Sequence, residues 1–241
     1  MGSISNKTNA FFSKSRWGAF FNPFFLTRKE LYKAIETHAS SLQGRIVDLG
    51  CGTKPYRHLF AHAHEYIGMD IEISGNKDQK SFVDVYYNGK HFPFDNQSID
   101  AVFSSETFEH IFNLDEVLSE IHRVLKKDGL LLATCPFTWP EHEVPYDYAR
   151  YTSFAIKDKL TKLGFEIIDY RKSGNYITAV IQLQVLYIYF FTNKIPLLNH
   201  LLFVLLITPQ FLVAWLLTRL LPRRMKRQDL YLNNIILAKK L

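Results

Sequence analysis

Two short apolar segments that each end in an acidic residue are the parts of this sequence best suited to bind a ligand. The first, 45–49, carries Asp48 and leads into Gly50-Cys51-Gly52, and the second ends at Asp70. Glycine lets a backbone approach a ligand closely, and an acid at a strand tip can accept hydrogen bonds from both hydroxyls of a ribose. The pattern therefore predicts a nucleotide-type pocket at the carboxyl ends of two strands.

The loop after the first segment distinguishes between two nucleotide-type cofactors. A dinucleotide site needs a third glycine and holds pyrophosphate at a helix N-terminus. Here Lys54, followed by Pro55, stands at the third glycine position, and Asp48 would repel a pyrophosphate. A methionine-type sulfonium has no phosphate, and its ammonium group suits Asp48. We interpret the loop as a site for S-adenosyl-L-methionine, with a plain turn built on Gly50 and Gly52 as the alternative.

Strand and helix patterns alternate over the first two thirds of the chain. Further strand-like runs recur at 82–85, 99–103, 130–134 and 166–170. Apolar residues at helical spacing predict a helix over 114–125, closed by Lys126, Lys127 and Gly129. Residues 27–36 begin an earlier helix. Such alternation predicts a parallel sheet that binds ligands outside the carboxyl ends of its strands.

Longer sequence blocks extend this pattern and carry a family resemblance. The blocks are DLGCGTKPY, YIGMDIE, FPFDNQSIDAVFSSETFEHI and EIHRVLKKDGLLLATCPF. Together they resemble the class I S-adenosylmethionine-dependent methyltransferases of the type 11 methyltransferase domain group, over roughly 42–171. The continuation PFTWPEHEVPYDYARYTSFAIKDKLTKLGFEI is similar to a bacterial subgroup often associated with cell-surface polysaccharide loci. The resemblance implies an α/β, Rossmann-like sheet of seven strands with helices on both faces and an apolar helical insert before the last strand.

The resemblance also implies which residues hold the cofactor. Asp48 and the glycine turn would surround its methionine part, Asp70 its ribose hydroxyls, and Asp84 its adenine amino group. The complete set of implied cofactor-binding residues is Asp48, Gly50, Cys51, Gly52, Asp70, Ile71, Asp84, Val85, Ser105 and Glu106. Glu109 and His110 match a recurrent pair of the family, and we expect them to stabilise a loop or a helix start.

The segment 139–151 is the best candidate for recognising the acceptor, because it follows the fifth strand and reaches the mouth of the pocket. Its catalytic candidates are His142, Asp147, Tyr148 and Arg150. A general base assists methyl transfer to a hydroxyl, and histidine serves that role near neutral pH, so we predict His142 as the base. The alternative is a capping loop in which Arg150 pairs with Asp147.

The last third of the chain is dominated by apolar residues from 177 to 221, with a basic cluster directly after it. The residues 231–239 then form a predicted strand that completes the sheet, so a single membrane crossing is topologically excluded. We expect interfacial helices in the cytoplasmic leaflet, because the basic residues suit anionic headgroups. The alternative is a pair of buried helices that form a dimer interface or a lid over the substrate.

The sequence therefore predicts four regions. They are an aromatic-rich N-terminal cap and helix (1–41), a cofactor-binding core (42–176), an apolar insert (177–227) and a final strand (228–241). The N-terminal segment lacks the continuous apolar stretch of a signal peptide. We expect a cytoplasmic protein, peripheral or monotopic on the inner face of the cell membrane.

Composition excludes several other classes of protein. The net charge of +6 is modest, and the basic residues do not form a nucleic-acid stripe. Cys51 and Cys135 both fall at predicted strand ends, which indicates free thiols in a reducing compartment. No Cys/His spacing resembles a zinc site, so the sequence predicts no metal centre.

The predicted function is S-adenosyl-L-methionine-dependent methylation of a small or lipid-linked acceptor. The first expectation is O-methylation of a surface-glycan or lipid-linked sugar precursor at the membrane. The alternatives are a quinone or lipid methyltransferase, and a catalytically inactive cofactor-binding scaffold. A homodimer through the apolar insert is a further expectation.

Overall fold

The computed structural model describes residues 19–20, 22–72, 82–194 and 199–241, and these fall into two compact units. The sheet unit comprises Ala34–Arg171 together with Asn234–Leu241. The helical unit comprises the chain up to Lys33 together with Lys172–Asn233. The predicted N-terminal cap falls largely on residues outside the described ranges.

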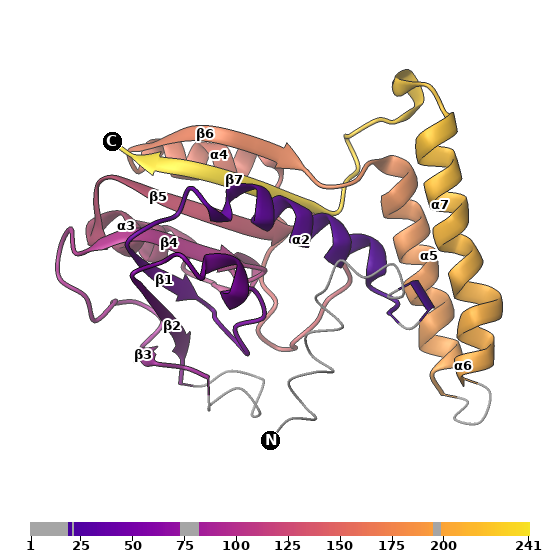
Figure 1. Cartoon of the computed structure of the whole chain (residues 1–241), viewed down its shortest axis with the longest axis horizontal. Coiled ribbons are helices and arrows are strands. Elements are labelled where there is room, and N and C mark those ends of the chain that lie inside the picture. Colours follow the sequence, from indigo (N-terminus) through magenta and orange to yellow (C-terminus); the bar gives the residue numbers. More distant parts are fainter. Residues whose placement is uncertain (1–18, 21, 73–81, 195–198) are drawn as a thin grey trace. The chain divides into compact units, whose positions relative to one another are not determined.

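A seven-stranded sheet forms the centre of the sheet unit, in the order β3-β2-β1-β4-β5-β7-β6 (Figure 1). Its strands are β1 (Arg45–Leu49), β2 (Glu65–Ile71), β3 (Val85–Tyr87), β4 (Ile99–Ser105), β5 (Leu125–Pro136), β6 (Phe165–Lys172) and β7 (Asn233–Lys240). The strands β1 to β5 pair in parallel, and Figure 1 shows β7 running opposite to β6. The predicted α/β class with seven strands is confirmed.

Two helices of this unit, α3 (Leu114–Val124) and α4 (Ser153–Lys162), bury apolar residues in the core of the sheet. A third helix, α2 (Phe25–Ala39), belongs to the sheet unit only from Ala34 onward. In α3 every apolar residue of the predicted stripe inside the helix is fully or almost fully buried, while Asp115 and Glu116 are exposed. This is the amphipathic pattern that anchors a surface helix to a core.

Two predicted element boundaries are wrong. Gly129 does not cap α3, because the chain is already extended at Leu125 and the left-handed conformation falls on Asp128 (φ 62°). The third strand begins at Val85 rather than at residue 82, so Asp84 precedes the strand instead of lying near its end. Both errors concern the residue at which a strand begins, and the ends of elements are the positions that local sequence determines least.

The helical unit is built from α5 (Tyr176–Thr192) and a second apolar helical segment, Asn199–Leu220. That segment consists of α6 (Asn199–Leu202), a π-helical stretch (Phe203–Ile207) and α7 (Thr208–Leu220). A buried cluster that includes Val185, Ile207 and Phe211 joins them. Asn175 begins α5 with a capping box, in which its side chain accepts from the backbone N–H of Thr178. Among the described residues, Asn199–Leu220 is the one helix long and apolar enough to cross a membrane.

The last strand returns to the sheet and ends on a buried lysine. Lys240 Nζ donates to the backbone oxygens of His122 (2.6 Å) and Leu125 (2.8 Å), at the C-terminal end of α3. These carbonyls belong to the end of the helix, where no backbone N–H of the next turn is present to pair with them. Lys240 therefore ties the final strand to the helix that covers the sheet.

Lys240→Met should lower the free energy of unfolding of the full chain by about 1–3 kcal/mol. The variant removes the ammonium that donates to the carbonyls of His122 and Leu125 and leaves both carbonyls without that donor. The measurement is the midpoint and slope of urea unfolding. Lys239→Met is the matched control, since that neighbour forms only solvent-exposed ion pairs with Glu166 and Asp128, which contribute little to stability. Equal losses in both variants would contradict the anchoring role.

Candidate active site

The glycine turn lies where the carboxyl ends of β1, β2 and β4 meet. Gly50 (φ 70°) and Gly52 (φ 48°) both adopt left-handed backbone conformations. The N–H groups of Gly50 and Cys51 donate to the Met69 carbonyl at 2.9 and 3.2 Å, which folds the turn back over β2. A Cβ on Gly50 would lie 2.3 Å from Oγ1 of Thr107, so the turn has no room for a side chain there.

Asp70 faces this turn from the end of β2. Its Oδ2 accepts from the N–H of Gly52 (3.2 Å), and its Oδ1 accepts from the N–H of Ile71 (2.8 Å). Burial raises the pKa of this carboxyl, although the two N–H groups oppose that effect. Each carboxylate oxygen has a second lone pair, so both can still accept from a ribose diol. The arrangement fits the role predicted for Asp70.

Lys54 performs a function that the sequence did not reveal. It adopts a left-handed conformation (φ 52°) at the third glycine position, and its buried ammonium pairs with Asp84. The side chain crosses β2 at Gly68, where a Cβ would lie 2.0 Å from Lys54 Cε. The loop is thus held to the sheet by an ion pair rather than by close glycine packing.

Asp84 is engaged by protein groups. Its Oδ2 accepts from Lys54 and from the N–H of Gly68 (2.7 Å), and half of its side chain is exposed. Although burial acts to raise its pKa, these two donors hold the pKa below the usual value. Its predicted contact with the adenine amino group stays a prediction, and so does that of the neighbouring Val85.

Asp48 lies inside β1 rather than at its tip. It is 3% exposed, and its Oδ2 accepts from the phenol of Tyr66 at 2.6 Å. Burial raises the pKa of Asp48 to about 7, against the opposing effects of the Tyr66 hydrogen bond and of Lys54. Its predicted pairing with the cofactor's ammonium stays a prediction. Cys51, next to the turn, is a buried free thiol whose pKa burial raises.

The hydroxyl group of Thr134, in β5, fixes the end of β4. Thr134 Oγ1 lies 3.0 Å from Ser105 Oγ and donates to Glu106 Oε1 at 2.8 Å. Glu106 has a positive φ of 54°, and its N–H donates to the Thr134 carbonyl. The strand therefore ends in a defined turn, which presents Glu106 at the same edge of the sheet as the glycine turn.

His142, Asp147 and Arg150 form one connected group in the segment after β5. His142 Nδ1 lies 3.1 Å from Asp147 Oδ2, and the N–H of His142 donates to the same oxygen (2.9 Å). Arg150 binds both oxygens of Asp147, at 2.5 and 2.6 Å. Asp147 therefore pairs with Arg150 and orients His142 at the same time. The predicted capping pair and the predicted base are thus compatible within one loop.

The electrostatics of this group favour a neutral histidine. Burial, followed by the nearby His110, lowers the pKa of His142. Burial acts to raise the pKa of Asp147, but the Arg150 hydrogen bonds outweigh it and hold the pKa at about 2. Asp147 is therefore a stable anion that accepts from Nδ1–H of His142. The ring then carries an unprotonated Nε2, as a general base requires.

Tyr148 contributes to the loop through its backbone. Its N–H donates to the carbonyl of Glu109 at 2.8 Å, and its half-exposed ring meets the edge of Phe112 at 5.4 Å between centroids. These contacts dock the loop on the turn after β4. The catalytic role of Tyr148 stays a prediction.

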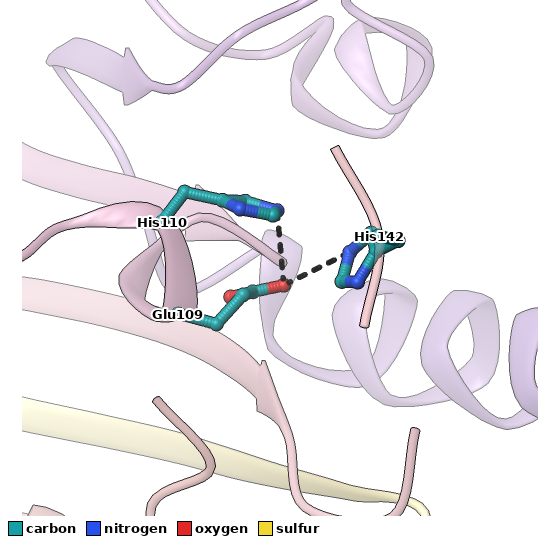
Figure 2. A group of neighbouring side chains, drawn as sticks. All are labelled: Glu109, His110 and His142. Carbon is teal, nitrogen blue, oxygen red and sulfur yellow. Dashed lines mark ion pairs between the residues drawn. The ribbon is translucent and has the colours of Figure 1, made fainter. Parts of the chain in front are cut away.

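Glu109 and His110, in the segment after β4, lie beside His142 of the loop after β5 (Figure 2). Glu109 Oε1 lies 3.7 Å from His110 Nε2 and 3.9 Å from His142 Nε2. Glu109 is 1% exposed, and neither of its carboxylate oxygens has a hydrogen-bond partner among the described residues. Sequence reasoning noticed the Glu109-His110 pair without expecting His142 beside it, because 32 residues separate the two segments.

The buried Asp48 makes stability depend on pH with a definite sign. A carboxyl with a pKa of about 7 in the folded chain and about 3.9 unfolded retains its proton longer when folded, so stability falls as pH rises between these values. Asp48→Asn keeps a neutral acceptor for Tyr66 and should flatten this slope by up to about 1.4 kcal/mol per pH unit. Urea unfolding at pH 5 and pH 7 without added cofactor measures it. An unchanged slope in the variant would show that Asp48 is ionised in the fold.

Comparison with known proteins identifies the family of this domain. Residues 47–133 match the family model described as "Methyltransferase domain". A malonyl-[acyl-carrier protein] O-methyltransferase of Coxiella burnetii is 35% identical over 109 residues, 41% of this chain and 38% of its own length. An uncharacterized protein of Methanocaldococcus jannaschii is 34% identical over 94 residues, 37% of this chain and 36% of its own length. The chain thus spans less than two fifths of the length of these curated relatives.

A solved structure extends the likeness to the fold. The S-adenosylmethionine-dependent methyltransferase of Mesorhizobium loti superposes with a TM-score of 0.54 at 14% identity, over 88% of this chain and 98% of that protein. The matched residues 47–133 include the glycine turn and Asp70. Residues 47–133 of the sheet unit accordingly match a methyltransferase domain, and the chain shares the fold of that solved structure.

Proposed function

We propose that this protein transfers a methyl group from S-adenosyl-L-methionine to an oxygen atom of a small or lipid-linked acceptor. The observation that carries the proposal is the oriented His142–Asp147 pair, in the same unit as the glycine turn and Asp70. When bound, the cofactor supplies a methyl group on a positively charged sulfur, which is a good leaving group.

The residues of this chain move one proton in the reaction. As the acceptor oxygen bonds to the methyl carbon and the carbon–sulfur bond breaks, the hydroxyl proton passes to Nε2 of His142. Asp147 stabilises the imidazolium that forms, and Arg150 keeps Asp147 ionised and in place. Positioning contributes the rest, because a bound acceptor and donor react without the entropic cost of meeting.

The helical unit supports an apolar, lipid-linked acceptor and a membrane surface. Many large apolar side chains of its helices are exposed, among them Tyr187, Phe190, Leu205, Leu212 and Leu220. Exposed apolar patches of this kind mark contacts with proteins or lipids. The basic residues Arg224, Lys226 and Arg227 follow, and each adds about 1 kcal/mol of attraction to an anionic surface. A surface-glycan or lipid-linked sugar precursor meets both conditions, and a quinone or lipid acceptor is the alternative.

A cavity within the helical unit has the character of a lipid site. Its volume is about 670 Å³, and apolar side chains such as Phe25, Leu212 and Trp215 line much of it. Lys29 and Arg219 add two positive charges to the same lining and Glu30 adds one negative charge, so the charge of the lining is positive overall. An acyl or prenyl chain attached to an anionic group would match both the apolar wall and the two cations.

Asp70→Ala should weaken cofactor binding at least tenfold, because the ribose hydroxyls lose a charged acceptor. Calorimetry with S-adenosyl-L-methionine measures this, and Glu72→Ala, at an exposed carboxyl two residues away, is the control that should bind as the parent does.

His142→Gln should bind cofactor normally but fail to restore the methyl mass to glycans or lipids of a strain that lacks the gene. No cofactor binding by the parent chain would overturn the proposal. Binding without any methylated product would indicate the inactive scaffold.

The full chain should float with anionic lipid vesicles in a density gradient and remain bound after a carbonate wash. The double variant Leu205→Glu/Leu212→Glu should reduce flotation, because it charges two exposed apolar positions of the helical unit. Phe154→Glu is the matched control, since Phe154 is 83% exposed on the sheet unit and should leave flotation unchanged. A lipid-free dimer that the double variant dissociates would instead support a protein interface.

A further inference from the structure

The cluster of Glu109, His110 and His142 brings one carboxylate and two imidazole nitrogens together with no hydrogen bond between them. The residues come from two segments, and their ligand atoms all lie within 4.8 Å of one another (Figure 2). Each interatomic separation to Glu109 exceeds hydrogen-bond length. A protein interior rarely leaves a carboxylate and two imidazole nitrogens facing one another unless a positive group lies between them.

The protonation of both rings follows from their other nitrogen. His110 Nδ1 lies 2.7 Å from the backbone oxygen of Tyr146, and His142 Nδ1 lies 3.1 Å from Asp147 Oδ2. A carbonyl and a carboxylate can only accept, so each Nδ1 carries the hydrogen; at His142 the 3.1 Å approach of Asp147 is closer than the 3.5 Å approach of the donor Arg150 Nη2. In the neutral rings each Nε2 therefore presents a lone pair, and both Nε2 atoms are the ones aimed at Glu109.

The same two hydrogen bonds are those that orient metal-binding histidines. Such histidines donate their second ring N–H to a carboxylate or a backbone carbonyl, which fixes the tautomer and the ring orientation. Here the His110 ring faces a backbone carbonyl and the His142 ring faces a carboxylate. In a tetrahedral zinc site the ligand atoms lie about 3.4 Å apart, given metal–ligand distances of about 2.0–2.1 Å. The two separations to Glu109, 3.7 and 3.9 Å, need to shorten by about 0.5 Å or less, and the third pair of ligand atoms, which lies within 4.8 Å, by up to about 1.4 Å.

The neighbouring cation, Arg150, forms no described hydrogen bond with Glu109. Arg150 donates to Asp147 and to the backbone carbonyls of Trp139, Pro140 and Ala149. Neither oxygen of Glu109 takes a hydrogen bond from any described group, although the side chain is almost fully buried. The buried carboxylate thus remains available to a ligand that approaches from the two histidines.

We propose that Glu109, His110 and His142 bind a divalent first-row transition-metal ion of the zinc class. Two imidazole nitrogens and one carboxylate oxygen suit such an ion, whereas Mg²⁺ and Ca²⁺ prefer oxygen ligands alone. Three protein ligands leave at least one coordination position open, as in catalytic zinc sites. The class of molecule that fits this open position is an acceptor with a hydroxyl oxygen, and only this last assignment rests on the proposed methyl transfer.

The test is metal binding by the full chain. After dialysis against a chelator, the protein should take up about one Zn²⁺ per chain from a competing chromophoric chelator, and added Mg²⁺ should not compete. His110→Gln and His142→Gln should each weaken Zn²⁺ binding at least tenfold. His64→Gln, at an exposed histidine outside the cluster, should bind as the parent does. Co²⁺ should replace Zn²⁺ and give a visible absorption spectrum typical of nitrogen and oxygen ligands.

Two further variants separate a ligand from a structural role. Glu109→Gln keeps the size of the side chain and removes only its charge, so the variant should fold as the parent does and lose Zn²⁺ binding. Asp147→Asn should weaken Zn²⁺ binding about tenfold or more by releasing the His142 ring. Equal Zn²⁺ affinity in the parent, His110→Gln and His142→Gln chains would overturn the site. Cofactor calorimetry on the same samples keeps the two proposals distinct, because either one can fail while the other holds.

Discussion

The carboxyl edge of the sheet carries more acidic side chains than cations that pair with them. Lys54 pairs with Asp84 and Arg150 pairs with Asp147, and each pair fixes a loop. Asp48 and Glu109 remain buried without a cationic partner in direct contact among the described residues. Burial raises the pKa of both carboxyls, because an ionised carboxylate in such a place is costly unless a positive charge arrives. S-adenosyl-L-methionine, with its sulfonium and ammonium groups, and a divalent ion would both stabilise the ionised forms, so these two buried acids explain why both proposals concern the same edge.

The two internal ion pairs also fix side chains of the two loops that border the proposed ligand site. Lys54 replaces a glycine contact by crossing β2 over Gly68, which makes the glycine in β2 as necessary as those in the turn. Arg150 holds Asp147, and Asp147 in turn holds the backbone and the ring of His142. Lys54 therefore ties the glycine turn to the sheet, whereas Arg150 organises its own loop around Asp147 and His142.

Sequence patterns predicted the parts of this architecture that depend on periodicity and on contiguous motifs. The glycine turn, Asp70 and the α3 stripe each lie within one short segment, so their spacing sufficed. The role of Lys54 and the junction of Glu109 with His142 depend on side chains that meet across the sheet edge. No local spacing encodes such meetings. The start of β3 was misjudged for a related reason, because Asp84 is placed by Lys54 and Gly68 rather than by its own segment.

A single lone pair links the two proposed activities of His142. Because Nδ1–H is committed to Asp147, Nε2 can either receive the acceptor's proton or hold a cation, but it cannot do both at once. A bound cation would lower the pKa of a hydroxyl coordinated to it, so loss of the free base would not remove the means of deprotonation. Metal occupancy would then change how the acceptor loses its proton while leaving the orientation by Asp147 unchanged. The Asp147–His142 hydrogen bond is thus required by either chemistry, and the Glu109 carboxylate by only one of them.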